Sequence, residues 1–289
     1  MRLSLLHDSA MLQRIESALR EDIGIGDITT ECTVPTDLQG EGMFVAKANG
    51  VLSGLEVAAT VFHLVDETLV IDAKCNDGMP VLRGAEIARV TGSIASMLTA
   101  ERVALNFLQR MSGIATATAG FVKLVEGSGA RILDTRKTVP GLRVFDKLAV
   151  RHGRGTNHRF GLDDMVLIKD NHIAAAGGLR SAVDLVASRL PAERGIKVEV
   201  EVADLNQLIE ALACTGVDVI MLDNMTVDEM TTAVKLVRAR RPEIKIEASG
   251  NVSEQTVRAI AETGVDMISI GALTHSVRAL DISFNISAR

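Results

Sequence analysis

The hydrophobic pattern of this 289-residue chain changes character near Ile132. Beyond that point, short apolar runs alternate with amphipathic stretches that are long enough to form helices. Such runs, bounded by polar segments, are typical of strands that a parallel sheet buries on both faces. Six runs are therefore expected to form strands: Ile132–Leu133, Met165–Ile168, Val198–Val202, Val219–Leu222, Ile244–Ala248 and Met267–Ile270.

The segments between these runs favour an open or incomplete α/β barrel, similar to a TIM barrel. Thr226 and Glu229 have the spacing of a helix-capping box between two of the runs. The sequence Thr-Gly-Val-Asp precedes one run at residues 215–218 and recurs before another at residues 263–266, two strand–helix units later. A doubly wound sheet is the alternative, although no G-x-G-x-x-G motif follows a strand.

The first hundred residues predict a separate α+β domain. A helix is expected from about Ser9 to Arg20, and strands are expected where apolar and polar residues alternate, in Met43–Lys47 and Glu86–Val90. A second helix, from about Thr99 to Met111, is expected to break at Ser112-Gly113.

The domain boundary is placed at that break. Residues 1–112 are assigned to the N-terminal α+β domain and residues 113–273 to the barrel. The C-terminal tail, residues 274–289, is expected to pack back on the first domain.

Composition and charge narrow the class of protein. The net charge of −6 argues against nucleic acid and acidic membranes as partners. The three cysteines are far apart, so neither a disulfide framework nor a thiolate zinc site is predicted. The N-terminus has no signal-peptide core and no apolar run has membrane-spanning length, so we expect a cytoplasmic protein.

Positive charge is concentrated between Arg131 and His172. This stretch holds nine Lys and Arg against five Asp, a local balance of +4 in an acidic chain. A solvated surface stripe is one interpretation. The alternative is an anion-binding site, because several of these residues directly follow predicted strands, where barrel enzymes place their reacting groups.

Polar residues follow or interrupt each predicted strand at that edge. They are Asp134–Lys137, Lys169–His172, Glu199 with Glu201, Asp223-Asn224, Ser249–Asn251 and Gly271-Ala272. We expect them to converge on one mouth of the barrel.

Two inward-facing carboxylates require compensation. Glu199 and Glu201 alternate within one strand and so share a face, where an unpaired carboxylate would be costly. Glu201 and Asp223 could together hold Mg²⁺, which prefers carboxylate oxygens. Interior salt bridges to Lys137 and Lys169 are the alternative.

The other polar segments suggest anion binding. Small residues at Ser249–Asn251 and Gly271-Ala272 let backbone N–H groups approach a phosphate. The glycine-rich loop at residues 153–161 is expected to close over a ligand and to bring His158 and Arg159 to its carboxylates. Neither a G-x-S-x-G elbow nor an H-E-x-x-H motif is present, which disfavours serine hydrolases and zinc enzymes.

Three motifs resemble the quinolinate phosphoribosyltransferase family, the decarboxylating nicotinate-nucleotide pyrophosphorylases. They are Asp134–Arg143, Asn157–Arg159 and Leu167–His172. Further matches follow the same order along nearly the whole chain: Glu21-Asp22, Gly26–Thr30, Glu101-Arg102, Leu105-Asn106, Val198–Val202, Met221–Asn224, Glu247–Gly250 and Ser269–Ser276.

The resemblance implies transfer of phosphoribosyl from phosphoribosyl pyrophosphate (PRPP) to quinolinate, which yields nicotinate mononucleotide, pyrophosphate and CO2 in NAD biosynthesis. It implies Mg²⁺ as cofactor and a homodimer in which Arg102 reaches the partner's site. Quinolinate would meet Arg102, Arg136, His158, Arg159 and Lys169. Thr135 and Lys137 would lie where the substrates join, Glu201 and Asp223 would serve ribose and Mg²⁺, and the phosphate would meet Ser249, Gly250, Asn251, Ile270, Gly271 and Ala272.

Two other functions stay open at this point. One is a family relative associated with molybdenum uptake that handles a different anion. The other is a non-catalytic barrel that only binds phosphate.

Overall fold

The computed structural model describes residues 8–191 and 194–288, which divide into two compact units. Within those residues, the first unit contains residues 8–119, 138–154 and 272–288, and the second contains residues 120–137 and 155–271. Among the described helices, none has the length and hydropathy that a membrane span requires.

The first unit is an antiparallel sheet with helices packed on a common core. The sheet has the order β12-β1-β5-β3, and β2 pairs with β4 separately. The strands are β1 (Gln39–Ala46), β2 (Gly50–Val51), β3 (Val70–Ala73), β4 (Pro80–Val81), β5 (Glu86–Ser93) and β12 (Ile282–Ala288). The helices are α1 (Ser9–Ile23), α2 (Ile28–Thr33), α3 (Leu55–Val65), α4 (Ile94–Leu124), α5 (Arg143–His152) and α11 (Ala272–His275).

Aromatic packing in this core joins distant parts of the chain. Phe44 of β1, Phe62 of α3 and Phe284 of β12 have ring centroids 4.5 to 5.8 Å apart. The alternating burial of β1 presents one face to this core. The C-terminal strand β12 pairs with β1 from Gly40↔Ala288 to Ala46↔Ile282, so the tail supplies an edge strand of the sheet.

The predicted break at Ser112-Gly113 is wrong. Helix α4 runs without interruption from Ile94 to Leu124. Gly113 lies inside it because the backbone of the C-terminal segment passes close by: a Cβ at this position would be 2.2 Å from the carbonyl oxygen of Arg278. The glycine therefore permits close packing and does not end the helix.

Residues 138–154 belong to the first unit, whereas the sequence analysis assigned them to the barrel. The guanidinium of Arg110 on α4 donates to both carboxylate oxygens of the buried Asp146 on α5, at 2.9 and 2.8 Å, and to the carbonyl of Thr274 at 3.2 Å. The rings of Phe107 and Phe145 pack 4.8 Å apart beside this ion pair. These contacts tie three separate chain segments into one unit.

The second unit carries the six predicted strands in one parallel sheet. They are β6 (Arg131–Leu133), β7 (Val166–Ile168), β8 (Val198–Val202), β9 (Val219–Asp223), β10 (Lys245–Ser249) and β11 (Met267–Ser269). The helices are α6 (Asp170–Ala176), α7 (Leu179–Arg189), α8 (Leu205–Leu212), α9 (Val227–Arg240) and α10 (Val257–Glu262).

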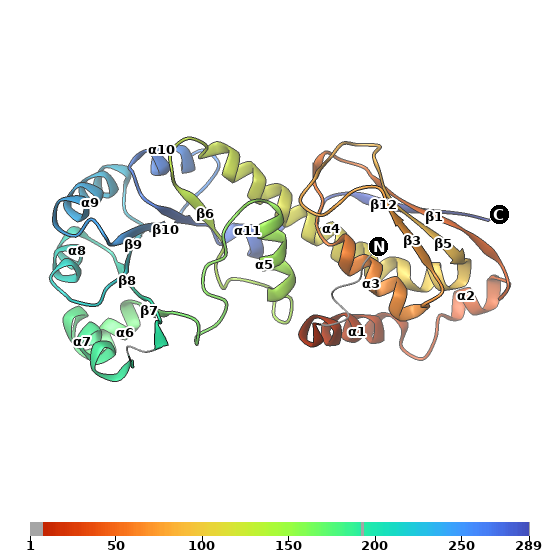
Figure 1. Ribbon diagram of the computed structural model, residues 1–289, viewed down its shortest axis with the longest axis horizontal. Coiled ribbons are helices and arrows are strands. Elements are labelled where there is room, and N and C mark those ends of the chain that lie inside the picture. The colour runs from red at the N-terminus through yellow and green to blue at the C-terminus, as the bar shows by residue number, and fades with distance from the viewer. Residues whose placement is uncertain (1–7, 192–193, 289) are drawn as a thin grey trace. The chain divides into compact units, whose positions relative to one another are not determined.

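The strand order confirms the open α/β barrel. It is β6-β11-β10-β9-β8-β7, so β7 to β11 are neighbours in chain order, and helices α8 to α10 follow the outer side of the curved sheet (Figure 1). The doubly wound alternative is wrong, because its strand order reverses at a switch point and its helices cover both faces. The predicted capping box is also present: the Glu229 carboxylate accepts from the backbone N–H of Thr226 at 2.8 Å.

We predict opposite effects from two alanine substitutions in α4. Gly113→Ala should lower the free energy of unfolding by about 1–3 kcal/mol, because the new methyl group must displace the backbone at Arg278. Gly120→Ala should raise it by about 0.5–1 kcal/mol, because no atom lies within 4 Å of its Cβ position and alanine favours a helix. Urea unfolding followed by circular dichroism measures both, and equal effects would contradict the packing role of Gly113.

Candidate active site

A cavity of about 520 Å³ lies in the second unit, at the carboxyl ends of its strands. Both basic and acidic side chains line it. Nine of the predicted site residues are among them: Thr135, Arg136, Lys137, His158, Arg159, Lys169, Glu201, Asp223 and Ser249. Strand ends that are far apart in sequence thus meet at one mouth, as the barrel predicts.

The buried carboxylate of Asp134 holds the loop that carries the predicted His-Arg pair. One oxygen accepts from the side-chain amide of Asn157 at 2.6 Å, and the other accepts from the backbone N–H of His158 at 2.8 Å. Thr156 also exchanges backbone hydrogen bonds with Ile132 and Asp134, so this segment extends the sheet beside β6. The beginning of the loop is therefore anchored to the end of a strand.

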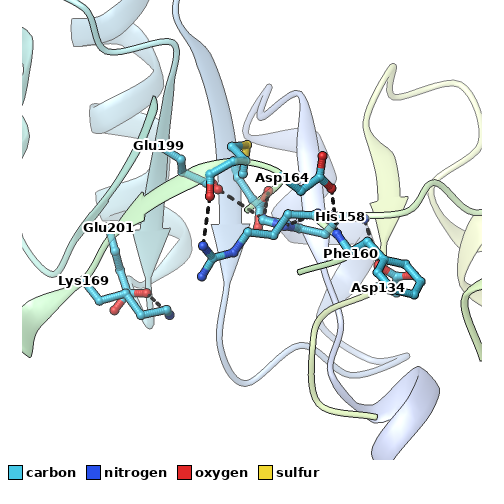
Figure 2. Close-up of polar contacts among 10 residues, drawn as sticks. Asp134, His158, Phe160, Asp164, Lys169, Glu199 and Glu201 are labelled. Carbon is cyan, nitrogen blue, oxygen red and sulfur yellow. Dashed lines mark hydrogen bonds and ion pairs between the residues drawn. The ribbon is translucent and has the colours of Figure 1, made fainter. Parts of the chain in front are cut away.

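Further contacts anchor the other side of this loop. The guanidinium of Arg159 donates to the carbonyl of Met165 at 3.0 Å, and the backbone N–H of Phe160 donates to Asp164 at 2.7 Å. Figure 2 shows this part of the loop near β7 and β8. Any closure over a ligand must therefore preserve or exchange these bonds.

The two arginines of the cavity are close enough to repel each other. Burial lowers the pKa of the Arg159 guanidinium, and the neighbouring charge of Arg136 lowers it further. Nearby Glu199 partly offsets both effects. A doubly negative ligand would relieve this repulsion, because each guanidinium can bind a carboxylate with a planar pair of donors.

Acidic side chains of β8 and β9 also line the cavity. Lys169 follows β7 and its ammonium lies 2.6 Å from the carboxylate of Glu201 on β8 (Figure 2). This is one of the two interior salt bridges that the sequence analysis offered as the alternative to Mg²⁺ binding. Asp223, at the end of β9, accepts from the side-chain amide of Asn224 at 2.9 Å.

The predicted phosphate segment has a strained backbone. Gly250 has φ +93°, and a Cβ on it would be 2.2 Å from the side-chain oxygen of Asn224. Asn224 and Asn251 also have positive φ, at 55° and 51°, and their side chains are hydrogen-bonded at 3.0 Å. Such conformations are costly for residues other than glycine and concentrate at functional sites.

A cluster of three buried groups forms the floor of the cavity. His158 Nε2 lies 3.1 Å from Glu199 Oε2 and 3.5 Å from Glu247 Oε2. Glu199 is 0% exposed and Glu247 is 1% exposed, and Glu247 also lines the cavity. Burial, together with the charge of Glu199, raises the pKa of Glu247 to about 8.

The remaining predicted residues lie outside the lining of this cavity. Gly250, Asn251, Ile270 and Gly271 are in the same unit but are not lining residues. Arg102 on α4 and Ala272, the first residue of α11, belong to the first unit. The Arg102 guanidinium is largely exposed and lies 3.9 Å from Glu101.

Sequence reasoning placed Asn224 at the mouth of the barrel without a role and gave no role to Glu247 or Ser269, although all three line the cavity. A signal existed for Glu247, because it is a carboxylate between the apolar residues Ile246 and Ala248 of a predicted strand. Glu199 drew attention because it alternates with Glu201 in one strand. The proximity of Glu199 to Glu247 could not be inferred, because β9 separates β8 from β10 in the sheet.

Comparisons with known proteins agree with this geometry. A family model described as the C-terminal domain of quinolinate phosphoribosyl transferase matches residues 114–285, and the model of the N-terminal domain matches residues 27–112. Together the two models cover most of the chain.

Individual relatives extend over nearly the full length. The chain is 45% identical to a probable nicotinate-nucleotide pyrophosphorylase (carboxylating) of Synechocystis, with 94% of this chain and 91% of the relative covered. It is 46% identical to the chloroplastic enzyme of that name from Arabidopsis thaliana, with 94% and 81% covered. The crystal structure of NadC from Streptococcus pyogenes superimposes with a TM-score of 0.92 at 39% identity, with 100% and 99% covered. The chain therefore belongs to the quinolinate phosphoribosyltransferase family.

Proposed function

We propose that this enzyme transfers phosphoribosyl from PRPP to quinolinate and releases pyrophosphate and CO2, forming nicotinate mononucleotide. The observation that carries the proposal is the division of one cavity into a basic and an acidic side. Arg136 and Arg159 suit a dicarboxylate, and Glu201 and Asp223 suit a ribose that becomes positively charged.

Quinolinate is assigned to the basic side. Arg136, Arg159 and Lys169 bind its two carboxylates, and the substrate's negative charge offsets the repulsion between the two guanidinium groups. His158 directs its Nε2 at Glu199 and accepts a hydrogen bond from the backbone N–H of Arg159 at Nδ1. Its contribution is therefore to position Arg159. Arg102 is assigned to the site of the partner subunit in a homodimer.

The phosphoribosyl group is assigned to the acidic side. As pyrophosphate departs, Glu201 and Asp223 stabilise the positive charge that develops on the ribose, and Lys137 neutralises charge on the leaving group. Thr135 lies where the two substrates meet. The phosphate is assigned to the small residues Ser249, Gly250, Asn251, Ile270, Gly271 and Ala272.

Mg²⁺ is proposed to enter with the pyrophosphate of PRPP, where it supplies a Lewis acid that neutralises the leaving group. The donor set fits an indirect role. Glu201 is already paired with Lys169 and Asp223 with Asn224, and the described residues bring no third acidic or histidine ligand to this pair. The two carboxylates would thus bind ribose hydroxyls or water molecules of the metal.

Decarboxylation requires little further chemistry from the protein. Once the pyridine nitrogen carries the ribose, its positive charge stabilises the electron pair that the departing carboxylate leaves on the adjacent ring carbon. The protein's task is to hold the ring and to exclude water.

We predict that Glu201→Gln lowers kcat by about 100-fold, because it removes a negative charge that faces the developing positive charge. The amide is similar in size and can still accept from Lys169, so the unfolding midpoint should not change. Nicotinate mononucleotide formed from quinolinate, PRPP and Mg²⁺ measures the effect. The exposed Glu254→Gln is the matched control, and full activity of the Glu201 variant would contradict its assigned role.

A mixing experiment tests the role of Arg102. Arg102→Ala and Glu201→Gln should each be inactive alone, but mixed dimers would contain one site with an intact Glu201 and a partner's intact Arg102. Random exchange of subunits should restore about a quarter of the wild-type activity. No recovery after proven exchange would show that Arg102 does not act across a dimer interface.

A further inference from the structure

The side chain of Glu247 has a position that the proposed reaction does not yet use. It projects from β10 between Met221 of β9 and Met267 of β11, its neighbours in the sheet register. It lines the cavity although it is only 1% exposed, and one of its oxygens, Oε1, has no hydrogen-bond partner. A buried ionised carboxylate in this position would be costly.

The histidine of the cluster is fixed in one tautomer. His158 Nδ1 accepts a hydrogen bond from the backbone N–H of Arg159 at 2.7 Å, so Nδ1 carries no proton. The ring is therefore neutral, its single proton is on Nε2, and it points toward Glu199 and Glu247. A neutral ring cannot balance two negative carboxylates.

The surroundings of Glu247 leave one proton as the balancing charge. The groups that face it are Glu199 on β8, His158 on the loop, Ser269 on β11 and Lys169 after β7. Lys169 is already paired with Glu201 at 2.6 Å. Neither oxygen of Glu199 has a well-formed hydrogen bond. Compared with Glu247, however, Glu199 is closer to His158 and to the charge of Arg159. Two like charges at this separation are avoided when one carboxylate is protonated.

A metal ion fits the cluster less well than a proton. One ligand atom from each of His158, Glu199 and Glu247 lies within 4.8 Å of the others, which is close enough for a shared cation. However, ligation through Nε2 would require the proton to move to Nδ1, where it would meet the N–H of Arg159. The tautomer therefore favours a proton.

We propose that Glu247 is a neutral carboxylic acid in the resting enzyme and that it donates its proton to the ring carbon that loses its carboxylate. The proposal rests on the phosphoribosyl transfer proposed above. The carbon–carboxylate bond breaks, CO2 leaves, and the electron pair that stays on the ring carbon takes the proton from Glu247. A carbon–hydrogen bond forms, Glu247 becomes a carboxylate, and it regains a proton from water when the product leaves.

Single-turnover kinetics of Glu247→Gln test this step, because glutamine keeps the shape and neutrality of the acid but has no acidic proton. Pyrophosphate release should stay within a few-fold of wild type, while formation of nicotinate mononucleotide should slow by about 100-fold or more. Glu247→Asp, which keeps an acid, should recover part of the second rate. Equal rates of the two steps in the glutamine variant, whether both normal or both slow, would overturn the proposal.

The same experiment separates this proposal from the proposed function. If wild-type enzyme releases no pyrophosphate from PRPP with quinolinate, the function itself is wrong. If wild type completes the reaction and Glu247→Gln does so at the same rate, only the role of Glu247 is wrong.

The protonation state can be tested without substrate. The pKa of Glu247 is raised from 4.5 to about 8, so the folded state binds more protons than the unfolded state between these values, and wild type should lose stability as the pH rises through this window. Glu247→Gln removes this loss, so its unfolding midpoint should gain on that of wild type as the pH rises from about 4.5 to about 8. Glu262→Gln on α10 is the surface control. A constant difference, or Zn²⁺ binding that wild type shows and Glu247→Gln lacks, would overturn the proposal.

Discussion

The buried carboxylate of Asp134 is the interaction on which the site depends. Asp134 directly follows β6 and accepts from Asn157 and from the backbone of His158, so it joins this strand to the loop that follows α5. The position of this loop decides where Arg159 points and which nitrogen of His158 carries a proton. Without this anchor, the basic side chains and the floor of the cavity would not be held in fixed positions relative to each other.

Inside the barrel, carboxylates replace some of the apolar side chains that would otherwise fill the space of this cavity. Leu133, Val219 and Met267, on three of the strands, form a small apolar cluster. Other positions on β8 and β10 hold the carboxylates Glu199, Glu201 and Glu247 instead. Burying carboxylates contributes less to stability than burying leucines, because each must find a cation, a donor or a proton.

The strands were predictable from sequence because each is a short apolar run that ends in polar residues, and all six were found. The helix break at Ser112-Gly113 was predicted wrongly, because the sequence cannot distinguish a glycine that ends a helix from one that allows a neighbouring backbone to pack closely. The grouping of Thr138–Arg154 with the first unit could not be inferred from sequence, since the Arg110–Asp146 pair links residues that no local pattern connects. Within the site, seven lining candidates were predictable because they follow or interrupt strands, and His158 and Arg159 because they lie in a polar, glycine-rich loop. The Glu199–His158–Glu247 cluster was not predictable, because it depends on how the strands align in three dimensions.

Two pairs of like charges face each other in this cavity, and they are balanced in different ways. The repulsion between Arg136 and Arg159, which Glu199 offsets only in part, is relieved by an anionic ligand. Glu199 and Glu247 can be relieved by one proton, which the neutral ring of His158 does not supply. A dicarboxylate substrate therefore balances the charge of the two arginines when it binds, whereas a proton already balances the two carboxylates before binding. The repulsion between the two arginines favours binding of the anion. The protonated Glu247 remains as an acid beside the pyridine ring of the substrate once the carboxylate of that ring has left.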